Sequence, residues 1–402
     1  MAKIFKLPFS NLSLVRDFNA KNPKDWLTLK LGFANKSGTN VTTSSSLALS
    51  AVWSCVRLLS QTVAQVPVKV YERTKDGKRL AVDHPLYNII HAEPNRIQTS
   101  FLFRELGQQH LELRGNFYSY IVRDGKQRPI ELQILNPDKV EPTEQDGELF
   151  YKVQGEKELI PSYDMLHVCG PMGDGLRGLS PIGVHKENLG LAIAAQDFGA
   201  SFFGNGANVG GILTTDATLK PEQRKNIKDS WGKSTVGNSN ANGTAVLDGG
   251  LKYQKITLSP EEAQFIQSRK FQVTEIARIF GVQPHLIQDL ERSTNNNIEH
   301  QSIEFVKFTV LPRIKRWENE LNRKLFREDE KGKYFIEFNL DGLLRGDSTS
   351  RGEYYSKLLQ NGVMNINEVR NLENLNRIDG GDKHMVQMNL TPIDKIGKED
   401  GN

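Results

Sequence analysis

The sequence has 402 residues, of which 38 % are hydrophobic and 25 % are charged, and its formal net charge is +4. This length and composition predict a soluble globular protein of two or more packed units, because a single core rarely extends so far. No apolar run approaches the roughly 20 residues that span a bilayer, and Met1–Pro8 lacks the apolar core of a signal peptide. The net charge is too small to indicate a nucleic-acid partner by itself.

The first 40 residues carry seven lysines and arginines against two aspartates. We interpret residues 1–40 as a flexible basic arm, although an arm that docks on a neighbour or on nucleic acid would have the same composition.

Residues 41–178 have the pattern of an α+β region. Apolar residues recur at helical spacing from Val52 to Val66, and Pro67 ends that helix. Asp-Gly pairs at 76–77, 124–125 and 146–147 lie between alternating segments and predict three β-hairpins. Hairpins, rather than alternating βαβ units, favour the α+β class.

A helix rich in small residues is expected to begin at Ser180–Pro181 and to extend to 204. Glycine inside a helix costs up to about 1 kcal/mol relative to alanine. Gly190, Ala194 and Gly199 therefore indicate that another helix backbone approaches closely, either within the monomer or between subunits. The region that follows, 205–258, is polar, with a short basic helix at 221–231 and two candidate strands.

The stretch Ser259–Phe326 predicts two long helices around a polar loop. Ser259 and Glu262 suggest a capping box for the first helix, which Gly281 ends. The second helix is expected to start near Asn297 and to contain an interior proline, Pro312, which costs about 3 kcal/mol if nothing compensates and predicts a kink. Its predicted buried residues are Ile298, Phe305, Phe308, Leu311, Ile314, Trp317, Leu321 and Leu325. A strand is expected near 333–345, followed by helices at 349–360 and 366–376.

Signatures of enzyme chemistry are weak. Gly232–Ser234 resembles the end of a phosphate loop, but the first glycine of that motif is replaced by Ile227 and no strand precedes it. The histidines show no metal-binding spacing, and His300 is interpreted as a helix-surface residue. We therefore expect no catalytic residues, no metal and no cofactor.

The remaining chemical features are two cysteines and a set of cations. Cys55 and Cys169 lie far apart in apolar contexts, so buried thiols in a reducing cytoplasm are favoured over a disulfide or a metal pair. A solvated helix face is the simpler interpretation of the basic residues around Pro312, and contact with phosphates is the alternative. These residues are Lys307, Arg313, Lys315, Arg316, Arg323 and Lys324.

The chain resembles the portal (head-to-tail connector) proteins of tailed bacteriophages over most of residues 45–376. The segments that carry the resemblance are ALSAVWSCVRLLSQTVAQVPVKVY, SPIG with FGASFFGNGANVGGIL, and FQVTEIARIFGVQPHLI with the helix that follows. By this resemblance the chain would form a ring of about twelve copies at one capsid vertex. Double-stranded DNA would pass through its channel non-specifically. The implied partners are the large terminase subunit, head-tail adaptor proteins, and major capsid and scaffolding proteins, with no membrane; the ring would be assembled in the host cytoplasm and reside in the virion.

The resemblance also implies a division of the chain. The parts would be an arm (1–40), a wing (41–178) with a returning strand (328–346), stem helices (179–204 and 259–285), a clip (205–258), a channel loop (286–297), a kinked helix (298–327), a crown (347–378) and a flexible tail (379–402). The DNA-facing residues of the channel loop would be Glu291, Arg292, Ser293, Thr294, Asn295, Asn296 and Asn297. Pro312 would mark the kink, and Gly190, Ala194 and Gly199 would pack the stem. Two alternatives stay open: a nucleic-acid-processing enzyme of unknown type, and a capsid or adaptor protein without DNA contact.

Overall fold

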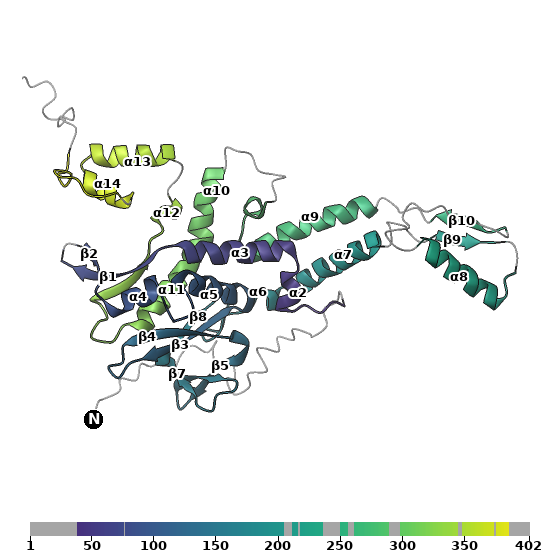
Figure 1. Ribbon diagram of the computed structural model, residues 1–402, viewed down its shortest axis with the longest axis horizontal. Coiled ribbons are helices and arrows are strands. Elements are labelled where there is room, and N and C mark those ends of the chain that lie inside the picture. Colours follow the sequence, from purple (N-terminus) through teal and green to yellow (C-terminus); the bar gives the residue numbers. More distant parts are fainter. Residues whose placement is uncertain are drawn as a thin grey trace, which may run out of the picture. The chain divides into compact units, whose positions relative to one another are not determined.

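The structure is a computed structural model that describes a large part of the chain (Figure 1). The described residues are 38–75, 77–204, 211–215, 218–235, 250–255, 261–288, 298–344, 348–373 and 375–385. The chain divides into two units, Met1–Phe338 and Asn339–Asn402. Antiparallel sheets and helices together confirm the predicted α+β class.

Antiparallel pairing joins all the strands within the described residues. Three sheets have three strands each, in the orders β11-β1-β2, β4-β3-β8 and β5-β6-β7, and β9 and β10 form a separate pair. The strands are β1 (Val68–Thr74), β2 (Gly77–Leu80), β3 (Asn116–Arg123), β4 (Pro129–Leu135), β5 (Val140–Gln145), β6 (Glu148–Val153), β7 (Ile160–Pro161), β8 (Met165–Cys169), β9 (Gly211–Thr214), β10 (Lys252–Lys255) and β11 (Tyr334–Phe338).

The three hairpins predicted from Asp-Gly pairs are confirmed, but one of the turns differs. At the β5–β6 turn, Asp146 and Gly147 both have positive φ values, 54° and 81°, which match the right-handed twist of the strands. The β3–β4 turn is longer, because Asp124 accepts hydrogen bonds from the backbone of Lys126 and Arg128, and Gln127 takes the positive φ of 62°.

The described residues of the first unit also form helices. They are α2 (Thr43–Leu47), α3 (Ser50–Gln65), α4 (Pro85–His91), α5 (Ser100–Arg114), α6 (Pro181–Val184), α7 (Lys186–Gly204), α8 (Pro221–Thr235), α9 (Glu261–Phe280), α10 (Ile298–Glu304) and α11 (Leu311–Leu325), with a π-helical segment at Phe305–Val310. Short 3-10 turns lie at Pro137–Lys139, Ser162–Asp164 and Pro284–Ile287.

The core of the first unit is centred on Trp317 of α11, which is fully buried. Its ring lies 4.8 Å from that of Phe117 on β3, and its Nε1–H donates to Gln108 Oε1 of α5 at 2.8 Å. A Cβ on Gly107 would stand 2.6 Å from the indole, so this glycine lets α5 approach the ring closely. Helix α11 therefore belongs to the same core as α5 and β3.

The two cysteines differ in burial. Cys55 on α3 is fully buried, as predicted, whereas Cys169 at the end of β8 is only partly buried. Both thiols are free.

The segment after β8 is held against the end of α5. Gly115 is left-handed, with φ 74°, and a Cβ there would collide with the backbone of Leu179. Asn116 binds this segment through two hydrogen bonds: its Nδ2 donates to the Gly178 carbonyl and its Oδ1 accepts from the Gly178 N–H, each at 2.8 Å. Helices α6 and α7 thus start from a fixed point on the sheet.

The predicted helix 180–204 is interrupted at His185, where φ −101° and ψ 27° leave the helical region. Ser180 caps α6, as its side chain accepts from the Gly183 N–H. The break separates two partners: α6 packs against α5, whereas α7 packs against α2 and α9. In α9 the predicted stop at Gly281 is confirmed by its φ of 67°, and the expected cap at Ser259 lies outside the described residues.

The second unit contains α12 (Asp341–Leu344), α13 (Ser348–Gln360) and α14 (Ile366–Leu372), so the two helices expected at 349–360 and 366–376 are present and the latter ends earlier. Asn365 and Glu368 form a capping box at α14. Residues 379–402 are expected to form a flexible tail, and the first of them are bonded to α14: the Asn367 side chain bonds to Ile378 and Asp382, and the Asn367 N–H to the Gly381 carbonyl. Residues 386–402 lie outside the described residues.

Candidate functional site

The predicted channel-loop residues, Glu291–Asn297, lie outside the described residues. The structure does describe what precedes and follows them. Helix α9 ends at Phe280, a 3-10 turn at Pro284–Ile287 follows, and the described chain resumes with α10 at Ile298. The candidate site is therefore the loop base, by which we mean the end of α9 at Phe280 and Gly281 together with residues 305–313 after α10.

Two side chains of the second helix bind the end of the first. Thr309 Oγ1 donates to the Gly281 carbonyl oxygen at 2.7 Å. Arg313, one turn further on, donates from Nη2 to the Phe280 carbonyl oxygen at 3.0 Å and from Nη1 to the Thr309 carbonyl oxygen at 2.8 Å. The carbonyls of Phe280 and Gly281 belong to the last residue of α9 and to the residue that ends it, where a helix leaves acceptors without partners. The end of α9 is thereby bound to the residues around the start of α11.

Arg313 is in turn fixed by Glu112 of α5. Its Nε and Nη2 donate to the two carboxylate oxygens at 2.6 and 3.1 Å. The side chains of Arg313 and Glu112 are 18 % and 6 % exposed, so little water screens the pair. Gln108 Nε2 donates a further hydrogen bond of 2.6 Å to Glu112 Oε1. The loop base is thus connected through one two-point ion pair to the core that contains Trp317.

These pairings correct one interpretation of the basic residues around Pro312. Arg313 is held by Glu112, Lys315 Nζ lies 2.5 Å from Glu318 Oε2, and Arg323 lies 2.7 Å from Glu320. The guanidinium of Arg313 donates its hydrogen bonds within the protein, and Lys324 is only 7 % exposed. The run is therefore neither a uniformly solvated face nor a row of unpaired cations for phosphates.

Pro312 occupies the first turn of α11, directly after the π-helical segment Phe305–Val310. A proline lacks a backbone N–H and clashes with the preceding turn of an α-helix, and a wider turn upstream is a common accommodation, frequent at functional positions. The bend at Pro312 stays a prediction.

The π-helical segment also explains a wrong prediction about Phe308. That side chain is 67 % exposed, whereas Val306, Thr309 and Val310 are buried. The extra residue in each π turn rotates the following side chains relative to an α-helix, so the 3.6-residue period used for the prediction fails at this point. Lys307 Nζ lies 5.3 Å from the centre of the Phe308 ring, and the pair forms an exposed feature near the loop base.

The small residues of α7 that are expected to pack the stem are at least partly buried in the single chain. Gly190 and Gly199 are buried within the single chain and Ala194 is partly buried, and the Gly190 carbonyl accepts from Thr39 Oγ1 at 3.2 Å. Leu191 and Phe198 of α7, seven residues apart, are instead 55 % and 59 % exposed in the single chain. Stem packing by Gly190, Ala194 and Gly199 between subunits stays a prediction.

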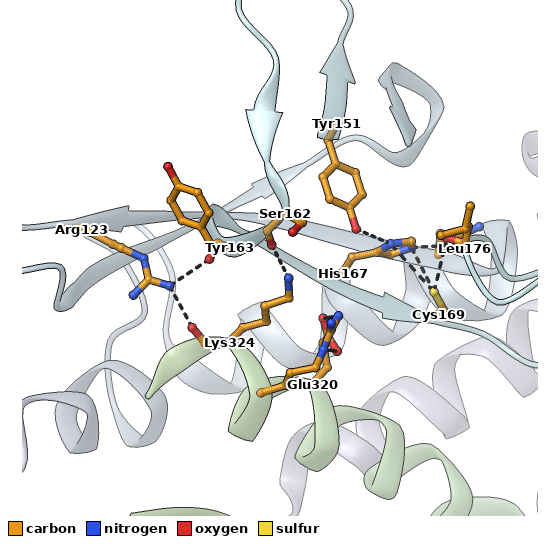
Figure 2. A network of polar contacts seen from close by, with 11 residues as sticks. Arg123, Tyr151, Ser162, Tyr163, His167, Cys169, Leu176, Glu320 and Lys324 are labelled. Atoms are coloured by element: carbon orange, nitrogen blue, oxygen red, sulfur yellow. Dashed lines mark hydrogen bonds and ion pairs between the residues drawn. The ribbon is translucent and has the colours of Figure 1, made fainter. Parts of the chain in front are cut away.

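One cluster superficially resembles a cysteine nucleophile with its base. Figure 2 shows Cys169 beside His167, with Sγ 3.3 Å from Nε2, and Tyr151 on the other side of the ring. Asn116 Oδ1, an acceptor, lies 3.1 Å from Nε2, and the Tyr151 hydroxyl lies 3.0 Å from Nδ1. Nε2 therefore carries the proton and Nδ1 accepts from Tyr151, so neither nitrogen is available to deprotonate the thiol.

The acidities of the cluster agree with this assignment. Burial lowers the pKa of His167 to about 3, and burial raises the pKa of the Cys169 thiol to about 11, with Glu320 adding to the rise. A reactive cysteine requires the opposite shift, toward the thiolate. The cluster is a neutral polar part of the core, in which His167 also stacks on Tyr118 at 4.2 Å.

The described residues contain no group of three or more His, Cys, Asp or Glu side chains arranged to hold a metal ion. Among the same residues, no helix is long and apolar enough to cross a membrane.

Comparisons with known proteins agree with the fold. The family model described as phage portal protein matches residues 50–374. The chain is 35 % identical over 358 residues to the portal protein of Enterobacteria phage HK97, covering 87 % of this chain and 84 % of that one. It is 36 % identical over 392 residues to the probable portal protein of Streptomyces phage phiC31, covering 93 % and 85 %. This chain therefore belongs to the phage portal protein family.

Solved structures share the fold at lower identity. A crystal structure of an HK97 family phage portal protein from Corynebacterium diphtheriae aligns with a TM-score of 0.58 and 20 % identity over 76 % of this chain and 98 % of that one. A chain from the neck of a native gene transfer agent particle, computed with C12 symmetry, aligns with a TM-score of 0.58 and 21 % identity over 88 % and 99 %.

Proposed function

We propose that this chain forms a closed ring of about twelve copies at one vertex of a phage capsid, through which double-stranded DNA enters during packaging and leaves at infection. The observation that carries the proposal is the match of the phage portal protein family model to residues 50–374, which include α9 and the helix that follows the loop. The loop between them, Glu291–Asn297, is the segment that would face the DNA.

The composition of this loop suits a non-specific contact. Ser293, Thr294 and the three asparagines have short neutral side chains, and Glu291 and Arg292 carry opposite charges. Contacts of this kind to the sugar-phosphate backbone carry no sequence information. The loop also lacks the several lysines or arginines that would pair with phosphates and produce tight, salt-sensitive binding. Such a loop permits DNA to move past it.

Ring formation is supported by the outward face of α7. A stripe of Leu191 and Phe198, seven residues apart on α7, is exposed in the single chain, and apolar helix stripes of this spacing pack against other helices. A second copy of the same helix pair, α7 with α9, would cover it around a ring. The C12 symmetry with which the neck of the native gene transfer agent particle was computed supports twelve copies.

We further propose the roles of the remaining segments. The β9–β10 pair and α8, within 205–258, form the clip that docks the large terminase subunit and later the head-tail adaptor proteins. The wing, 41–178, with β11 paired to β1 contributes the outer part of the ring that meets the major capsid and scaffolding proteins. The second unit supplies the crown. The neck and virion origin of related structures supports location in the virion, after assembly in the host cytoplasm.

The alternative of a nucleic-acid-processing enzyme is disfavoured by the chemistry of the described residues. The Cys169–His167–Asn116 cluster is neutral and internally bonded, and the family is a structural one. The purified protein should show neither nuclease nor ATPase activity, with or without Mg²⁺. The alternative of a capsid or adaptor protein without DNA contact predicts no salt-dependent DNA binding by the assembled ring.

The decisive experiment on the loop is deletion of Glu291–Asn296 in the phage. The proposal predicts intact rings and particles that package or retain less DNA. Particles with normal packaging and retention would exclude a DNA-contacting role for the loop.

A further inference from the structure

A basic pocket of about 470 Å³ lies on the first unit, at the C-terminal end of α11. Side chains from the β3–β4 hairpin, the 3-10 turn at Ser162–Asp164 and the segment after α11 contribute to it. Its lining residues include five cations and one carboxylate: Arg123, Arg323, Lys324, Arg327, Lys331 and Glu328. Figure 2 shows Lys324 reaching toward Ser162, with Arg123 and Tyr163 beside it.

Four of the five cations have carboxylate partners. Arg123 bonds to Asp164 at 2.9 Å, Arg323 to Glu320 at 2.7 Å, and Lys331 to Glu328 at 2.6 Å. Arg327 pairs with Glu330 and Asp329. Among the lining residues, Lys324 is the cation for which no carboxylate lies within ion-pair distance.

Lys324 is also the most buried of these five cations. The residue is 7 % exposed, and its ammonium donates to the Ser162 carbonyl oxygen. An ammonium has three N–H donors, so two remain beyond this bond. A buried ammonium without a counter-charge is costly, and burial together with the neighbouring Arg323 lowers the pKa of Lys324 to about 8.

The surrounding contacts hold the pocket open in a fixed shape. Arg123 Nη2 donates to the carbonyl oxygens of Tyr163 and Lys324, each at 2.9 Å, and so connects the 3-10 turn to the end of α11. Arg327, the next cation along the wall, has a buried Nε without a hydrogen-bond partner. Two cationic side chains with unused donors therefore line the same pocket.

We propose that this pocket binds a small oxyanion, a phosphate or a carboxylate group, with Lys324 and Arg327 as its donors. An anion there supplies the counter-charge that Lys324 lacks. The cavity has room for a group of this size rather than for a duplex. Lys324 lies some 15 residues along the helix from Thr309, about 20 Å at 1.5 Å per residue, so the site is separate from the loop base. The inference goes beyond the proposed function and does not depend on it.

The first test uses the unmodified full-length chain. Limited acetylation with acetic anhydride, followed by mass spectrometry, measures the reactivity of each lysine in phosphate, acetate or chloride at one ionic strength and pH. Phosphate at saturating concentration should slow the acetylation of Lys324 about tenfold by occupancy. Lys315, on the same helix but paired with Glu318 outside the pocket, is the internal control and should change less than about twofold.

The two anions identify the ligand chemistry. Protection by phosphate alone supports a tetrahedral oxyanion, and protection by acetate as well supports a site that accepts a partner's carboxylate. Equal reactivity of Lys324 in all three salts would overturn the proposal.

A second test uses substitutions. Lys324→Met keeps the length of the side chain and removes its charge, and Lys315→Met is the matched control. Calorimetric titration with inorganic phosphate should show about tenfold weaker binding to K324M, equivalent to about 1.4 kcal/mol, and unchanged binding to K315M. Equal binding by both variants would contradict the assignment, and if K324M does not fold, the acetylation result decides.

Discussion

Arg313 and Glu112 lie 201 positions apart in the sequence and form a two-point ion pair, with nitrogen–oxygen distances of 2.6 and 3.1 Å. The same arginine binds the last carbonyl of α9. One side chain thus connects the core helix α5, the end of α9 and the helix that follows the loop. A change in the position of this arginine would therefore affect α5, the end of α9 and the start of α11 together.

Replacing Arg313 by methionine should reduce the free energy of unfolding by about 3–5 kcal/mol, because the buried Glu112 carboxylate loses its counter-charge. Denaturant unfolding measures this loss. The double variant Glu112→Met/Arg313→Met should recover part of it, since no charge is then left buried. Lys331→Met, which breaks the exposed pair with Glu328, should cost about 0–1 kcal/mol. Equal losses for R313M and K331M would show that the buried pair has no special role.

Replacing Thr309 by valine keeps the shape of the side chain but leaves the Gly281 carbonyl without its donor, at a cost of about 1–3 kcal/mol. If the bond holds the loop base, trypsin cleavage after Arg292 should accelerate about fivefold or more in T309V. Thr309→Ser retains the hydroxyl and should cleave at the wild-type rate. The role of Thr309 would be refuted by identical cleavage of T309V and the wild type.

Stability should fall on mild acidification because of buried neutral histidines. The ordinary pKa of 6.5 applies to the unfolded chain, whereas burial lowers the pKa of His167 to about 3 and that of His110 to about 4. Between these values the unfolded chain binds protons that the folded chain does not, so stability is full above pH 6.5 and declines as pH drops.

His167 alone should contribute a loss of about 2 kcal/mol between pH 6.5 and 5. The variant His167→Gln should be less stable at pH 7 but should lose about 2 kcal/mol less over that interval, as measured by urea unfolding at each pH. His110 remains in both proteins and so does not affect the difference. A pH dependence unchanged in H167Q would contradict the neutral state assigned to His167.

The sequence was informative where structure depends on local chemistry. Asp-Gly pairs predicted the hairpins, Gly281 predicted the end of α9, and Asp146 with Gly147 adopts the positive φ values that such a turn requires. Glu112, by contrast, lies in a helix with no motif around it, and no local pattern connects it to Arg313.

The errors also have physical causes. Phe308 was expected to be buried because a single 3.6-residue period was extended through the π-helical segment Phe305–Val310. The break at His185 arises because α6 and α7 pack on different partners, which periodicity does not register. Thr309 and Lys324 are functional candidates only because distant segments surround them.

Ring assembly should depend on the exposed stripe of α7. Leu191→Asp places a charge at a side chain that is 55 % exposed in the single chain, so folding should change by less than about 0.5 kcal/mol. The ring, in contrast, should dissociate, since the charge would be buried at a helix–helix contact. Asp197→Ser, at an exposed polar position of the same helix, is the control. Size-exclusion chromatography with light scattering would show intact rings of L191D if the stripe makes no contact between copies.

Electron microscopy of the purified full-length chain tests the central claim most directly. The account predicts closed rings of about twelve copies with a central channel wide enough for a DNA duplex, and with the loop between α9 and α10 facing that channel. A protein that remains monomeric at high concentration, or rings whose channel is too narrow for a duplex, would contradict it.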